Sequence, residues 1–128
     1  MQWTSTNTYA ALLSRLVLGE VGVPALAPTR LAVGNGGHDN ATGQPIPPTR
    51  NDTALASPVT DVALSSVLRD GATITLIGIV PGGAQPLLIS EVGVLTASGV
   101  LVARATFAPQ TITEGVDAQF TLALFPEA

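Results

Sequence analysis

The sequence contains no cysteine, no lysine and a single histidine, His38. Without cysteine, disulfide bridges, iron–sulfur clusters, thiolate zinc sites and cysteine nucleophiles are all excluded. One histidine cannot form a multi-histidine site, and the missing lysine removes the residue that a P-loop needs to contact phosphate. The sequence therefore predicts no cofactor-binding site and no metal site of these kinds.

Charge of either sign is scarce, because charged residues make up only 11% of the chain against about 25% in an average soluble domain. Five arginines and nine acidic residues give a net charge of -4. No basic face is available to neutralise a phosphate backbone, so we expect no nucleic-acid partner.

Long apolar runs are also absent, although 46% of the residues are apolar and the mean hydropathy is +0.44. The longest runs, such as 77–81 and 100–103, are far shorter than the roughly 20 residues of a membrane-spanning helix. Residues 1–6 lack the basic start and apolar core of a secretory signal. We therefore expect synthesis in the cytoplasm without membrane insertion, and association with other copies through apolar surface that so few charges cannot cover.

One segment has helical periodicity, and it predicts a helix over about 8–18. Its apolar residues recur at intervals of three and four, which places them on one face; they are Tyr9, Leu12, Leu13, Leu16 and Val17. Ser5, Thr6 and Asn7 are candidate N-caps. Gly19, Gly22, Pro24 and Pro28 prevent continuation of the helix.

A glycine-rich stretch follows a short predicted strand at 29–33. Its sequence is Gly34-Asn35-Gly36-Gly37, and we expect its glycines to adopt backbone angles that other residues resist. Prolines and polar residues then fill 38–58, which completes a long loop over about 34–58. Loops of this length are commonly functional, so we interpret it as a candidate contact surface.

The remaining residues, about 59–126, predict a β-meander. We expect strands at 59–68, 72–80, 88–95, 100–107 and 118–125, with turns at 69–71, 96–99 and 113–115. The whole chain, 1–128, is thus expected to be a single domain of the α+β class, mainly β. Its N-terminal helix should pack on an antiparallel β-meander or sandwich of about 5–7 strands.

No catalytic constellation emerges. There is no Gly-x-Ser-x-Gly elbow, and a serine triad would have to use His38. Glycoside hydrolysis needs facing carboxylates, usually with aromatic platforms, and aromatics are scarce. A weak cation site from His38, Asp39, Asp52 and Asp61 is conceivable, but its spacing matches no calcium loop, and a surface histidine in a mobile loop is favoured. We expect no enzyme.

Glu91 is unusual because it interrupts the apolar stretch 87–94. A carboxylate buried in such a strand must be paired or hydrogen-bonded. Arg104, on the next predicted strand, is the expected partner. We interpret Glu91 as a structural ion pair or as a group that caps backbone N–H groups, rather than as a catalytic acid.

The order of these segments resembles the N-terminal attachment domain of phage tail-collar and tail-fibre proteins. After the helix, Leu31-Ala32-Val33-Gly34-Asn35-Gly36-Gly37 is similar to that family's Ala-Val-Gly-Asp-Gly-Gly motif, with Asn35 in place of Asp. Thr53-Ala54-Leu55 then precedes the first long strand. Ile89-Ser90-Glu91-Val92-Gly93-Val94-Leu95 is close to its Glu-Val-Gly-Leu-Phe/Tyr stretch, and residues 99–105 follow. The motif residues are Gly34, Gly36, Gly37, Glu91, Gly93 and Arg104.

The resemblance implies attachment. It predicts a virion structural protein made in the host cytoplasm, either a baseplate or tail-tip component or an adaptor for a separate fibre. Family members commonly act as homotrimers, so the expected partners are copies of this chain and other tail, baseplate or fibre proteins. In such fibres the module opens a longer chain with a receptor-binding tip, whereas this sequence ends at Ala128, so no receptor-binding role is expected. The alternative is a small carbohydrate-binding β-module that contacts host glycans.

Overall fold

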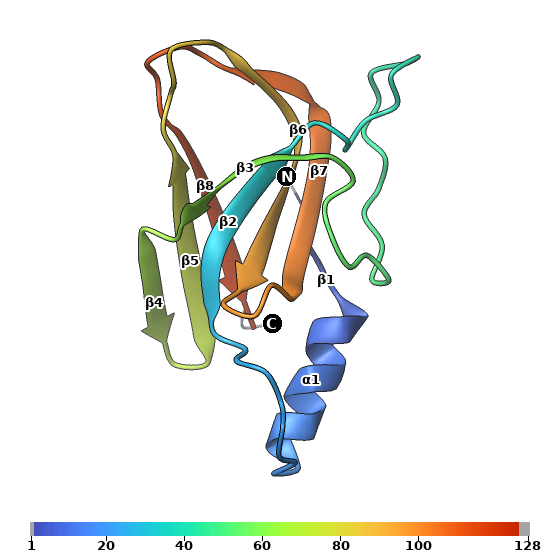
Figure 1. Cartoon of the computed structure of the whole chain (residues 1–128), viewed down its shortest axis with the longest axis vertical. Helices are drawn as coiled ribbons and strands as arrows, with labels where there is room; N and C mark the ends of the chain where they lie inside the picture. Colours follow the sequence, from blue (N-terminus) through green and yellow to red (C-terminus); the bar gives the residue numbers. More distant parts are fainter. Residues whose placement is uncertain (1, 126–128) are drawn as a thin grey trace.

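Two antiparallel β-sheets face each other in the computed structural model, which describes residues 2–125 (Figure 1). The predicted end of the last β segment, residue 126, lies outside the described residues, as do 1, 127 and 128. One sheet has five strands in the order β1-β7-β6-β2-β3, and the other has three in the order β4-β5-β8. The strands are β1 (Thr4–Ser5), β2 (Pro28–Gly34), β3 (Pro58–Ala63), β4 (Ser66–Asp70), β5 (Thr73–Val80), β6 (Leu87–Thr96), β7 (Leu101–Ile112) and β8 (Ala118–Leu124).

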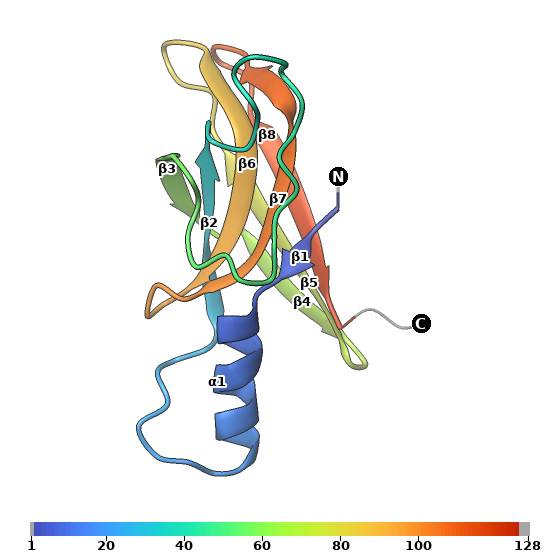
Figure 2. The same ribbon diagram turned by 90° about the vertical axis from the view of Figure 1, so that its right-hand side faces the viewer.

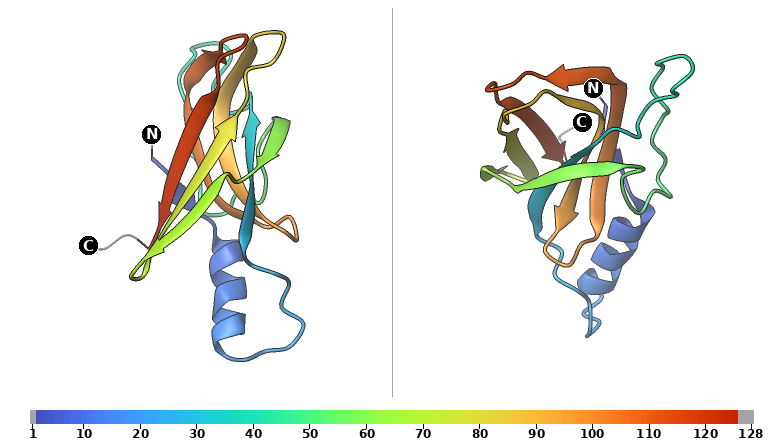
Figure 3. Two further views of the ribbon diagram at one scale, coloured as in Figure 1. Left: turned by 90° about the vertical axis from the view of Figure 1, so that its left-hand side faces the viewer. Right: turned by 45° about the horizontal axis from the view of Figure 1, so that its top comes forward.

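The core lies between the sheets, where the three-stranded sheet covers one face of β2 and β6 (Figure 3). Alternate residues of each strand point inward, as a half-buried sheet requires. The inward side chains include Leu31, Val33, Leu76, Val92, Val94 and Leu122. The opposite face of β6 is buried too, because the loop between β2 and β3 lies over it and contributes Leu55. A helix plus an antiparallel sandwich confirms the predicted fold class.

The predicted strand 59–68 is wrong, because the chain changes sheets in its middle. Leu64 donates its N–H to Thr29 in the five-stranded sheet (2.9 Å), and Ser65 donates to Ile77 in the three-stranded sheet (2.8 Å). The segment therefore forms two strands, β3 and β4, which a short link joins at the side of the sandwich (Figure 3). Consequently Leu68 does not share a buried face with Val62 and is 61% exposed.

Strand order departs from a simple meander. β2 lies between β6 and β3, and β8 pairs with β5 rather than with β7. β1 was not predicted at all, because its two residues carry no pattern and are ordered by pairing with Arg104 and Ala103 of β7. Residues 2–125 thus contain eight strands, more than the expected five to seven. The predicted turn at 113–115 is confirmed, and the one predicted at 96–99 lies at 97–98. The turn predicted at 69–71 lies at 71–72 instead, because Arg69 and Asp70 still pair in β4. Gly71, Gly99 and Gly115 adopt the left-handed conformation.

The predicted helix is confirmed as α1 (Asn7–Val17). Thr6 is its N-cap and accepts the N–H of Tyr9, while the Thr6 hydroxyl donates to the carbonyl of Leu101 (2.6 Å). Only the first half of the apolar stripe reaches the sandwich. Tyr9 is buried, but Val17 is 83% exposed, because α1 extends beyond the ends of the strands (Figure 2). Within residues 2–125 no helix has the length and hydropathy to cross a bilayer.

Candidate functional site

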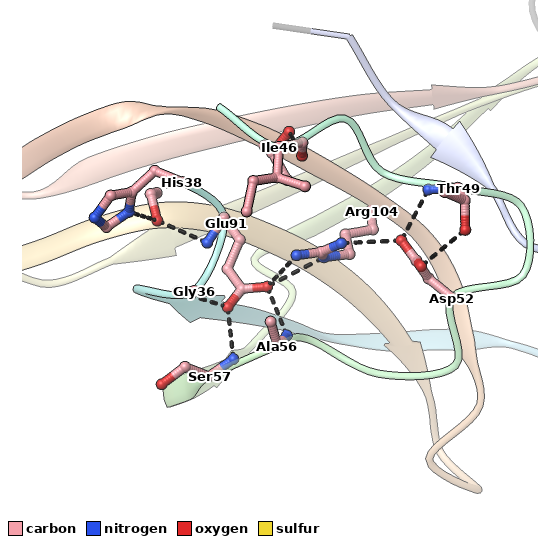
Figure 4. Close-up of polar contacts among 12 residues, drawn as sticks. Gly36, His38, Ile46, Thr49, Asp52, Ala56, Ser57, Glu91 and Arg104 are labelled. Atoms are coloured by element: carbon pink, nitrogen blue, oxygen red, sulfur yellow. Dashed lines mark hydrogen bonds and ion pairs between the residues drawn. The ribbon is translucent and has the colours of Figure 1, made fainter. Parts of the chain in front are cut away.

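Glu91 is the centre of the most elaborate polar cluster in the fold (Figure 4). Its side chain lies on the face of β6 that the β2–β3 loop covers, and it is fully buried. Oε2 accepts the backbone N–H groups of Gly36 (2.9 Å) and Ser57 (2.8 Å), and Oε1 accepts that of Ala56 (2.8 Å). One carboxylate therefore holds both ends of the long loop.

Arg104 supplies the countercharge, as the sequence predicted. The β6–β7 register pairs Gly93 with Arg104, which places the guanidinium diagonally across from Glu91. Arg104 donates to Glu91 Oε1 from Nε (3.1 Å) and Nη2 (2.8 Å), and from Nη1 to Asp52 Oδ2 (2.9 Å). Asp52 in turn accepts the N–H of Thr49 (2.9 Å) and its hydroxyl (3.0 Å). Both predicted roles of Glu91, ion pairing and backbone capping, are present together.

The pKa values of Glu91 and Asp52 both lie below their ordinary values. Burial by itself raises the pKa of Glu91, but hydrogen bonds from Ser57, Ala56, Arg104 and Gly36 outweigh it, so the pKa lies below its ordinary value. The pKa of Asp52 is also lowered, because hydrogen bonds from Thr49 and Arg104 exceed the opposing effect of burial. The cluster is therefore a set of charges and hydrogen-bond donors that satisfy one another.

The motif glycines are needed for close approach rather than for unusual backbone angles, so the prediction about their conformation is wrong. Gly34, Gly36 and Gly37 all lie outside the left-handed region. A Cβ on Gly36 would lie 2.8 Å from the Cβ of Ala56, and one on Gly37 would collide with the carbonyl of Ser90. At Gly34 it would be 2.7 Å from Glu91 Oε2. The missing side chains let the loop backbone reach the carboxylate.

Gly93, on β6 next to β7, also leaves space for close packing. A Cβ there would lie 2.9 Å from the side chains of both Leu55 and Leu101. The space that this glycine leaves is filled by Leu55, the buried anchor of the loop. All six residues singled out from the sequence thus lie in or directly beside the Glu91 cluster.

His38 is half-buried, and its ring contacts β6 rather than projecting freely from the surface. Its Nδ1 lies 2.8 Å from the Ser90 hydroxyl, which also accepts the N–H of Gly37 (2.8 Å). Ser90 is fully buried, and His38 is half-buried beside it. The conceivable cation site is not assembled either, since Asp52 and Asp61 pair with Arg104 and Arg30. Residues 2–125 contain no cluster of His and carboxylate side chains that could hold a metal ion.

Sequence reasoning missed the contribution of Asp52 and of the Ala56 and Ser57 amides. Asp52 lies in a stretch without periodicity, so nothing linked it to Arg104. Backbone donors carry no sequence signal at all. Neither a scan against protein-family models nor a search of curated proteins gives a match to this chain.

Proposed function

We propose that this chain is a structural component of a phage or phage-like tail, a baseplate or tail-tip adaptor that attaches tail fibres or forms their base. The observation that carries the proposal is the convergence of its motifs. Of the segments that resemble the tail-fibre attachment domain, 31–37, 53–55 and 89–95, together with Arg104 from 99–105, meet at or beside Glu91. Short motifs that form one physical unit support the resemblance far better than scattered ones.

Exposed apolar side chains support a function in assembly. Within residues 2–125 they occur on the helix, on several strands and on loops; they include Leu16, Leu18, Val21, Ile46, Val67, Leu68, Leu88 and Phe125. Apolar surface of this kind contributes affinity when partners cover it, at about 25 cal/mol per Å² before the costs of association. The proposal includes contacts with other tail proteins and with copies of this chain. The resemblance implies that these copies form a homotrimer.

The test is to image particles whose gene for this chain has been deleted. We expect missing fibres or an incomplete tail tip, with restoration when the chain is supplied from a plasmid. A matched rescue with Glu91→Gln, which disturbs the motif cluster but leaves the exposed surface unchanged in composition, should restore fewer fibres. Intact, fibre-bearing, infectious particles from the deletion would contradict the proposal.

A second candidate, glycan binding, has one observation in its favour. Phe107 and Phe120 stack with ring centroids 6.4 Å apart, and with Gln110 and Gln119 they line a surface pocket of about 240 Å³. Aromatic faces with nearby amides suit sugar rings. A glycan array should then give hits that Gln119→Ala weakens and that Gln85→Ala, outside the pocket, does not. An array without hits at about 100 μM protein, a concentration that detects free energies near -5.5 kcal/mol, removes this candidate.

A further inference from the structure

Asn35 and Gly36 form an asparagine–glycine pair at the start of the β2–β3 loop, and Asn35 is exposed. Asparagine loses ammonia most readily before glycine, because a residue without a side chain leaves the next backbone nitrogen open to attack the side-chain amide. The pair occurs once in the sequence, since Asn7, Asn40 and Asn51 precede threonine, alanine and aspartate. The unfolded chain should therefore react first at Asn35.

The reaction needs no reagent other than water. A base removes the amide proton of Gly36, and the nitrogen attacks Cγ of Asn35, so that a new C–N bond forms. The proton is returned to the side-chain NH₂ group, which leaves as ammonia. Water then opens the resulting cyclic imide at either carbonyl, and position 35 becomes aspartate or isoaspartate.

In the folded chain the backbone of this pair is held on both sides (Figure 4). Asn35 donates its N–H to the carbonyl of Ser57 (3.0 Å), and Gly36 donates to Oε2 of the fully buried Glu91 (2.9 Å). The space beside Gly36 is filled as well, because a Cβ there would lie 2.8 Å from the Cβ of Ala56 and 2.8 Å from the Ser57 nitrogen. The Gly36 nitrogen therefore cannot turn towards Asn35 without breaking these contacts.

Charge opposes the reaction too. The attacking nitrogen of Gly36 must become an anion, and in the fold it would lie 2.9 Å from the carboxylate of Glu91. Two negative charges at this distance in a buried site repel strongly. Burial raises the pKa of Glu91, but the hydrogen bonds that it accepts lower the pKa further, so the carboxylate is also a poor base for removing that proton.

We propose that Asn35 is a site of covalent self-modification that the contact between Glu91 and Gly36 keeps closed in the folded chain. Once Gly36 leaves the carboxylate, ammonia is lost at Asn35. Isoaspartate at this position lengthens the main chain by one carbon atom just before Gly36, so the loop no longer returns to Glu91 in register. A reversible opening of the loop then becomes permanent. The inference does not depend on the proposed tail function.

Hydrogen exchange tests the protection without any substitution, because base-catalysed exchange removes the same proton from Gly36 that the reaction must remove. Gly43, in the same loop, is the control, since its N–H donates to a neutral acceptor, the carbonyl of Asp39 (2.7 Å). After correction for neighbouring side chains, we expect Gly36 to exchange at least about tenfold more slowly than Gly43. Equal rates would overturn the proposal.

Peptide mapping by mass spectrometry measures the reaction itself. In the wild-type chain the reaction at Asn35 should be at least about tenfold faster in guanidinium chloride than in the folded state. Thr42→Asn supplies a matched control, since it places a second asparagine–glycine pair before Gly43, where a Cβ would meet nothing within 4 Å. In the folded variant, position 42 should react at least about tenfold faster than Asn35. Equal rates at the two positions, or no effect of unfolding, would contradict the proposal.

Glu91→Gln separates protection by the carboxylate from protection by folding in general. In chains that also carry Thr42→Asn, it should speed the reaction at Asn35 relative to position 42. Thr6→Ala destabilises the helix N-cap without touching Glu91, so it should leave this ratio unchanged. An unchanged ratio in Glu91→Gln, or a slower reaction that would identify the carboxylate as a base, would refute the inference. If Glu91→Gln does not stay folded, the exchange comparison between Gly36 and Gly43 decides.

Discussion

The substitution Glu91→Gln tests whether the buried carboxylate holds the loop to the sheets. Glutamine has the same shape but offers one oxygen and one NH₂ group in place of two charged oxygens. The Glu91 carboxylate accepts from three backbone N–H groups and from two nitrogens of Arg104. Whichever way the amide is turned, at least two of these donors face another donor, and the buried guanidinium keeps only Asp52 as a countercharge.

The expected loss of unfolding free energy is about 3–5 kcal/mol, the range for removing one partner of a buried ion pair. A single domain has only about 5–15 kcal/mol in total. The matched control is Asp61→Asn on the surface. Asp61 accepts two hydrogen bonds from Arg30, both 2.9 Å, so its geometry is comparable, but both side chains are nearly half exposed. Solvent screening limits that pair to about 1 kcal/mol or less.

Urea unfolding at pH 7, followed by circular dichroism, measures both variants against the wild type. Asp52→Asn removes only the outer carboxylate and should lose an intermediate amount, about 1–2 kcal/mol. This variant keeps the series informative if Glu91→Gln does not fold cooperatively. If Glu91→Gln and Asp61→Asn lower the free energy of unfolding by amounts that agree within about 1 kcal/mol, the reasoning is refuted. Burial of an ion pair would then make no difference to its contribution to stability.

Further predictions follow from the same contacts. The pKa values of Glu91 and Asp52 are lower in the folded state than in the unfolded state. Their contribution to stability is therefore present above about pH 5 and is lost as the pH falls through the folded pKa values. Between pH 7 and pH 3 the free energy of unfolding should fall less steeply for Glu91→Gln than for the wild type. Gly37→Ala should lower the free energy of unfolding in urea by more than about 2 kcal/mol, because its Cβ collides with a carbonyl of β6. Gly43→Ala, in open space at φ 71°, should lower it by about 1 kcal/mol. Equal losses for the two variants would contradict this prediction. Thr6→Ala removes an N-cap and a buried hydrogen bond, so thermal unfolding should show a loss of about 1–3 kcal/mol, largely restored in Thr6→Ser; no loss would exclude the capping role.

Local sequence patterns were sufficient to predict two kinds of element. These are the helix, whose backbone hydrogen bonds lie within one segment, and hairpins, whose two strands are adjacent in the sequence. The helix was predicted because its caps and apolar spacing lie within eleven residues. The Glu91–Arg104 pair was predicted because a charge within an apolar strand requires a partner, and the hairpin between β6 and β7 brings only one within reach.

Features that depend on distant segments were not predictable. β1 is ordered only by its pairing with β7, about a hundred residues away. The corner at Leu64 and Ser65 is set by two different sheets, whereas the stretch 59–68 contains no glycine or proline that would mark a break. The apolar stripe of α1 indicated a buried face but not its extent, because the length of the neighbouring strands decides where burial ends. Each failure reflects tertiary context overriding a local pattern.

Because both ends of the β2–β3 loop are fixed on one carboxylate, the tip of the loop is free to change without strain on the sheets. Beyond the anchors, residues 39–44 form a small arm, closed where the N–H of Asp39 donates to Gln44 (2.9 Å) and the N–H of Gly43 to Asp39 (2.7 Å). Loop-closure entropy grows only slowly, by about 0.6 kcal/mol for each doubling of length. The arm is thus a natural insertion point, where added residues should disturb the two sheets little.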